Sequence, residues 1–160
     1  GIVELRKCLR NYENLSNNNY KIAIISLGKE RNINLGNNKI KQFHIDYIKD
    51  LKKLNLLFSS CDIFLNLTKN DFGPILCEIA FQNNIFILSS NIGIAKEIVI
   101  DNHNGFIYKN NDQLYKKFEM IIDLAIQKSK VKTNKFSKMR TIYALNKSKK
   151  FNKIFNEKFL

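Results

Sequence analysis

The chain has 160 residues, of which 44% are hydrophobic and 26% are charged. This size and composition favour one globular domain and exclude a disordered chain or a disulfide-stabilised scaffold. The three cysteines, Cys8, Cys61 and Cys77, form no CxxC pair and have no histidine at ligand spacing. We therefore expect a reduced, cytoplasmic compartment and no structural zinc. No apolar run approaches the ~20 residues that span a bilayer, and no signal peptide is visible.

The net charge of +13 is concentrated near the carboxyl end of the chain. Residues 128–160 hold eleven Lys and Arg against one acid, which leaves 16 basic and 13 acidic residues, a net +3, for residues 1–127. We therefore expect a Rossmann-like domain over residues 1–127 and a basic, carboxyl-terminal helical tail of the same domain over residues 128–160. A solvated basic helix is the preferred interpretation of this tail, ahead of peripheral contact with the inner face of a membrane. A nucleic-acid patch ranks last, and no nucleic-acid partner is expected.

The first part of the chain alternates between helical and strand patterns. Apolar residues at helical spacing predict a first helix: Ile2, Leu5, Cys8 and Leu9. The polar run Ser16–Asn19 separates this helix from a strand over Tyr20–Leu27, which Gly28 ends. A second strand is predicted over Ile40–Ile45. A second helix follows, with apolar residues at helical spacing: Ile48, Leu51, Leu54, Leu57 and Phe58.

The same alternation continues in the second part of the chain. Strands are predicted over Asp62–Leu67, Asn84–Ser89 and Gly105–Tyr108, and Asp112 is the expected N-cap of a long final helix. Strand–helix alternation predicts an α/β fold, a Rossmann-like parallel sheet with helices on both faces. A doubly wound domain normally begins with a strand, so we expect its first strand to be missing before Gly1.

Only residues 61–78 carry a pattern that points to chemistry. A strand leads through a polar loop into Phe72-Gly73-Pro74 and then into a helix that holds Glu78. Proline suits the first helical turn, and the free amides that follow it can bind a phosphate. Gly73 lets a ligand approach the backbone, and Glu78 could accept hydrogen bonds from a ribose. An ordinary strand-to-helix turn with a solvated glutamate explains the same spacing.

Three motifs in a fixed order extend this pattern over nearly the whole chain: CDIFLNLTKNDFGPILCEIAF, IFILSSNIGIAKEIV and DNHNGFIY. Their order and spacing resemble the carboxyl-terminal, donor-binding domain of retaining GT-B glycosyltransferases of the family-4 type. The resemblance implies transfer of a sugar, with retention, from a nucleotide diphosphate-sugar donor to a glycan or lipid acceptor. It requires no metal or other cofactor, and the acceptor would bind through a missing amino-terminal domain.

The resemblance also implies catalytic and donor-binding residues. Asn70 stands where the family has the first glutamate of a pair, near the donor sugar, and Asp71 could supply the charge if the loop shifts by one residue. Glu78 matches the second glutamate, which holds the ribose hydroxyls. The other implied donor-binding residues are Phe72, Gly73 and Pro74 at the sugar-facing turn, Ile75 and Leu76 at the diphosphate, and His44 beside the base. For His44, a partly packed loop histidine is the simpler interpretation.

Departures from the family pattern keep two other functions open. Asn70 lacks the charge of a glutamate, Ile94 replaces a glycine and Lys96 replaces a proline. The basic residues that neutralise the diphosphate in this family would lie before Gly1, so we expect this chain alone to be inactive. One alternative is a degenerate, non-catalytic GT-B-like module. The other is a basic domain that binds a membrane or nucleic acid.

Overall fold

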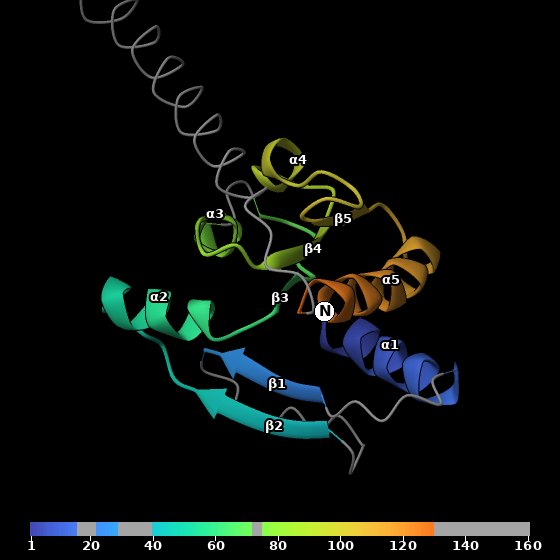
Figure 1. Cartoon of the computed structure of the whole chain (residues 1–160), viewed down its shortest axis with the longest axis horizontal. Coiled ribbons are helices and arrows are strands. Elements are labelled where there is room, and N and C mark those ends of the chain that lie inside the picture. Colours follow the sequence, from blue (N-terminus) through green and yellow to red (C-terminus); the bar gives the residue numbers. More distant parts are fainter. Residues whose placement is uncertain (16–21, 29–39, 72–74, 130–160) are drawn as a thin grey trace, which may run out of the picture.

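The computed structural model describes residues 1–15, 22–28, 40–71 and 75–129 (Figure 1). The first elements are α1 (Ile2–Leu15), β1 (Ile22–Leu27), β2 (Ile40–Ile45), α2 (Leu51–Ser59) and β3 (Ile63–Asn66). They are followed by α3 (Ile75–Gln82), β4 (Phe86–Ser90), α4 (Ala95–Ile98), β5 (Gly105–Tyr108) and α5 (Asn111–Ser129). The expected basic tail beyond residue 129 lies outside the described residues. No helix in the described ranges is long and apolar enough to cross a membrane.

The strands pair in parallel, as predicted, and are divided between two sheets. β1 pairs with β2, with Ile22 opposite Ile40. In the other sheet β4 lies between β3 and β5, with Ile87 opposite Gly105. Figure 1 shows the two sheets as neighbours, with β1 next to β3, although no strand ladder joins them in the described part of the chain. The α/β class with a parallel sheet architecture is confirmed.

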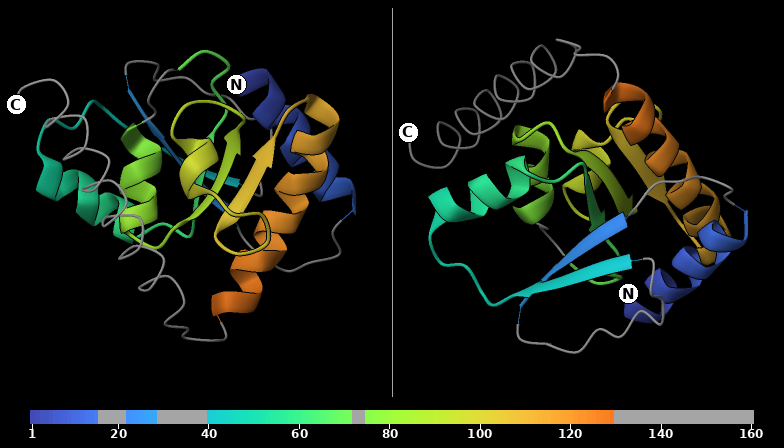
Figure 2. Two further views of the ribbon diagram at one scale, coloured as in Figure 1. Left: turned by 90° about the horizontal axis from the view of Figure 1, so that it is seen from above. Right: turned by 60° about the horizontal axis from the view of Figure 1, so that its bottom comes forward.

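Helices cover both faces of the three-stranded sheet, which confirms the second part of the prediction. On one face, Phe86 and Leu88 of β4 pack in a cluster with α1 and α5. On the other face, Ile87 packs with residues of α2, α3 and α4. In both views of Figure 2, α1 and α5 lie side by side, away from α2 and α3. Successive residues of a strand point to opposite faces, so a strand covered on both faces is apolar at nearly every position.

The start of α5 differs from the prediction, which placed Asp112 at the N-cap. The helix begins at Asn111, and the Asn110 side chain accepts a hydrogen bond from the backbone N–H of Gln113 at 2.9 Å. Asn110 is therefore the capping residue, and Asp112 lies in the first turn, where its charge favours the helix dipole. Asn and Asp are equally good N-caps, so residue type could not distinguish the two positions.

Candidate functional site

The candidate site is the loop Leu67–Asp71 together with the first turn of α3. The loop leaves the carboxyl end of β3, and the first turn of α3 holds Glu78. Ligands of open α/β sheets bind at the carboxyl ends of the strands, where loops and helix N-termini meet. The predicted turn Phe72–Pro74 connects the two parts and lies outside the described residues.

A chain of buried polar side chains lies beneath this loop. Asn66, which is 5% exposed, donates a hydrogen bond from Nδ2 to Ser89 Oγ at 2.9 Å. The Thr68 hydroxyl donates to Asn66 Oδ1 at 2.8 Å, and the Ser90 hydroxyl donates to the backbone carbonyl of Thr68 at 2.5 Å. The loop is thus held to β3 through the side chain of Thr68 and to β4 through its main chain.

Two further groups connect this polar chain to neighbouring elements. Burial raises the pKa of Tyr108 on β5 to about 12, while a side-chain hydrogen bond with Ser90 acts in the opposite direction. Burial likewise raises the pKa of the Cys77 thiol to about 11, against the opposite effect of side-chain hydrogen bonds with Ser89 and Asn66. Cys77 is therefore a protonated, structural thiol at neutral pH, and it fixes the first turn of α3 to the sheet.

The structure places several predicted site residues along this edge of the three-stranded sheet. Asn70 is exposed at the end of the loop, and Asp71 beside it is half-buried. On α3, Ile75 is 67% exposed and Leu76 is half-buried. Glu78 is half-buried, and its Oε1 accepts a hydrogen bond from Gln82 Nε2 at 3.3 Å. Among the described residues, the start of α3 therefore lies at the surface, where helix N-termini can bind anions.

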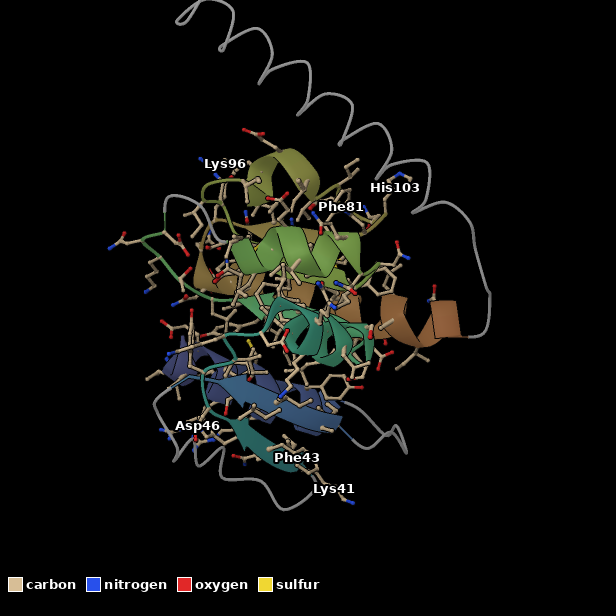
Figure 3. All side chains as sticks on the ribbon, turned by 90° about the vertical axis from the view of Figure 1, so that its left-hand side faces the viewer. Lys41, Phe43, Asp46, Phe81, Lys96 and His103 are labelled. Atoms are coloured by element: carbon tan, nitrogen blue, oxygen red, sulfur yellow. The ribbon has the colours of Figure 1, made fainter. Side chains whose placement is uncertain are left out.

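His44 lies in the other sheet, at the end of β2. Its Nδ1 is hydrogen-bonded to Ser26 Oγ on β1 at 3.0 Å, and its Nε2 lies 3.5 Å from Asp46 Oδ1. Figure 3 shows the labelled β2 residues Lys41 and Phe43 near Asp46, at the end of the molecule opposite Lys96. The structure thus assigns His44 to the two-stranded sheet, whereas the other described candidates follow the three-stranded sheet.

The comparison with protein families identifies the family of this chain. A family model described as "Glycosyl transferases group 1" matches residues 3–138, which include every described helix and strand from Val3 onward. The chain belongs to the glycosyl transferases group 1 family. No curated protein matches the chain. Membership of this family supports a role in glycosyl transfer, and the parallel α/β architecture agrees with the Rossmann-like half of a GT-B enzyme.

In this glycosyltransferase domain, one cation of the site loop is paired with α1. Lys69 Nζ lies 3.3 Å from Glu4 Oε1, and the amino group of Gly1 lies 3.0 Å from Glu4 Oε2. Contacts with the Gly1 amino group, then with backbone and Lys69, lower the pKa of Glu4 to about 2. Sequence reasoning missed this pair because Glu4 and Lys69 are far apart in the chain.

Sequence reasoning also missed the polar chain under the loop of the glycosyltransferase domain. The sequence carries only a weak indication of this polar chain. Ser89 and Ser90 follow the apolar residues at the start of the run Ile85–Ser90, and Asn66 is the last residue of β3. Polar residues at the carboxyl ends of buried parallel strands are candidates for a shared network, because those ends meet at one edge. Within the described residues, no group of three or more His, Cys, Asp and Glu side chains is placed to hold a metal ion.

Proposed function

We propose that the chain is the donor-binding half of a retaining GT-B glycosyltransferase. It would take a nucleotide diphosphate-sugar and transfer the sugar to a glycan or lipid bound by a separate, amino-terminal domain. One observation carries the proposal: the family match spans the sheet edge at which β3 leads through a polar loop into α3. This is the edge where α/β folds bind nucleotides.

The first turn of α3 supplies the contacts proposed for the nucleotide diphosphate. The backbone amides of Ile75 and Leu76 have no acceptor within the helix, and the helix dipole favours negative charge at this end. One turn further, the carboxylate of Glu78 can accept hydrogen bonds from both ribose hydroxyls. Phe72, Gly73 and Pro74 form the proposed turn against the donor sugar.

The loop supplies the charge proposed for the reacting sugar. Asn70 is neutral, so Asp71 is the carboxylate available at this position, and its half-buried setting strengthens its field relative to a fully solvated group. Negative charge beside the anomeric carbon stabilises the positive charge that develops there in the transition state. Asn70 is the proposed hydrogen-bonding partner of the sugar.

Nucleotide binding tests the role of Glu78. We expect calorimetry with UDP, GDP and ADP to detect binding of at least one nucleotide, without turnover of a sugar donor by the chain alone. Replacing Glu78 with Ala removes a charged acceptor of ribose hydrogen bonds, so affinity should fall by about 10- to 100-fold.

The matched control is Asp123→Ala, which removes an exposed carboxylate from α5. Its affinity should equal that of the wild-type chain. Binding that is tight and unchanged by Glu78→Ala would refute the ribose role, and the absence of binding to all three nucleotides would refute donor binding by this chain.

A further inference from the structure

Ser90 connects the site loop to the interior of the sheet. Its side chain is 7% exposed at the end of β4, and its hydroxyl donates to the Thr68 carbonyl at 2.5 Å. A hydrogen bond also joins Ser90 to the buried Tyr108 of β5.

The bond from Ser90 acts on an exposed part of the loop. The side chains of Thr68, Lys69 and Asn70 are exposed, so water has access to this part of the loop. The bond restrains the position of the loop, because the Thr68 hydroxyl also donates a hydrogen bond to Asn66 Oδ1. Two anchors on one residue fix the backbone immediately before Asn70 and Asp71.

We propose that Ser90 is a positioning residue for the donor sugar. It touches neither donor nor acceptor; through its bond to the Thr68 carbonyl it fixes Thr68 and thereby the loop residues Asn70 and Asp71 in the arrangement that receives the sugar. This proposal rests on the proposed function, because it gives the loop its ligand. A loop fixed in advance loses less conformational entropy when the donor binds.

The proposal separates two parts of the donor. The ribose and diphosphate contacts come from α3, whereas the sugar contacts come from the loop that Ser90 anchors. Loss of the Ser90 hydroxyl should therefore weaken binding of a nucleotide diphosphate-sugar more than binding of the nucleotide diphosphate. A general loss of stability would weaken both to the same extent.

The test compares Ser90→Ala with Ser59→Ala in the full chain. Ser59 offers the matched control, because its hydroxyl donates to the backbone carbonyl of Leu56 at 2.8 Å on α2, away from the site loop. The probes are UDP, GDP and ADP, each paired with UDP-glucose, GDP-mannose or ADP-glucose. We expect Ser90→Ala to lower the affinity ratio of sugar nucleotide to nucleotide by about fivefold, and Ser59→Ala to leave it unchanged.

Amide hydrogen exchange provides a reading that needs no ligand. In Ser90→Ala, the amides of Lys69, Asn70 and Asp71 should exchange faster than in Ser59→Ala. Thr68→Ala, which removes the other anchor from an exposed position, should act in the same direction even if Ser90→Ala folds poorly.

The outcomes separate this proposal from the proposed function. Unchanged loop exchange in both Ser90→Ala and Thr68→Ala overturns the positioning role, as does an equal loss of affinity for nucleotide and sugar nucleotide. A third outcome is faster loop exchange in the variants together with no nucleotide binding by the wild-type chain. That outcome refutes donor binding. It also overturns the positioning role, because Ser90 would then anchor a loop that receives no donor.

Discussion

Three buried or half-buried thiols make the stability of this protein sensitive to alkaline pH. Burial raises the pKa of Cys8 to about 12 and that of Cys77 to about 11, and it also raises the pKa of Cys61. The ordinary pKa of a cysteine thiol is 9.0, so the unfolded chain releases these protons first. The stabilising contribution of the protonated thiols is therefore complete below pH 9 and declines as the pH rises toward the folded values.

We predict that the urea midpoint of unfolding falls between pH 9 and pH 10, before Tyr108 contributes. In the double variant Cys8→Ala and Cys77→Ala, the slope over this interval should be shallower, although the variant is less stable at every pH. A midpoint that is constant from pH 8 to pH 10 in the wild-type chain would contradict this prediction. Alkylation by iodoacetamide should likewise be slow for Cys8 and Cys77 until the chain unfolds.

The sequence could predict the location of some residues of the candidate site but not the contacts between its separate elements. Ile75, Leu76 and Glu78 belong to one continuous motif, so their common location could be predicted from spacing. The contacts of Ser90 with Thr68 and of Lys69 with Glu4 join residues from separate elements. A single sequence carries no record of such pairs, because each partner alone is an ordinary polar residue of a strand end, loop or helix.

At the scale of elements, the pairing of β4 with β5 depends on the absence of a side chain at Gly105. An ideal Cβ on this residue would lie 1.9 Å from the carbonyl oxygen of Ile87, its partner in the ladder, and the φ of Gly105 is +156°. Gly105→Ala must separate the two strands, and we predict a loss of about 3 kcal/mol or more in the free energy of unfolding.

Urea denaturation of a matched glycine variant checks this prediction. Gly28 also has a positive φ, +121°, but no atom of the described residues lies within 4 Å of its ideal Cβ. Gly28→Ala therefore carries backbone strain without a clash and should lose only about 1 kcal/mol. Equal losses in the two variants would show that strain, rather than contact with Ile87, determines the cost.

The boundaries of the elements were less predictable than their order. The strand over Gly105–Tyr108 agrees with β5, and the run Tyr20–Leu27 contains β1. The four-residue helix α4 is too short to produce a helical period, so the sequence pattern did not predict it. The order of helices and strands follows from alternating burial, whereas each helix start depends on one capping bond among similar residues.

At the scale of the whole molecule, the described strands fall into one group of two and one group of three, as strands do on the two sides of the first strand of a doubly wound sheet. The order 3-2-1-4-5-6 places two strands on one side of the first strand and three on the other. β2 and β1 correspond to the first group, and β3, β4 and β5 to the second. Apolar side chains of β1 and β3 pack in the same cluster, so these are the edges that one further strand would join.

Gly1 lies beside the carboxyl end of β3. An ideal Cβ on Gly1 would be 3.3 Å from the Leu67 Cβ, just beyond the carboxyl end of β3. We predict that a Val- and Ile-rich strand added before Gly1 raises the melting temperature and protects backbone amides of β1 and β3 from exchange. The control carries a proline at the centre of the added strand, which removes a ladder hydrogen bond. Equal effects of the two extensions, or protection of β2 and β5 alone, would contradict the prediction.

The packing of α1 against α5 also bears on how quickly the molecule folds. These helices stand at opposite ends of the described chain and lie side by side (Figure 1), sharing a cluster that includes Leu9 and Phe118. Each strand of the β3–β5 sheet is joined to the next by a short crossover, whereas the α1–α5 contact closes a loop of nearly the whole described length. The chain loses the entropy of closing that loop before the contact between α1 and α5 stabilises the fold. Docking of α1 is therefore expected to slow folding, an effect that the free energy of unfolding at equilibrium does not show.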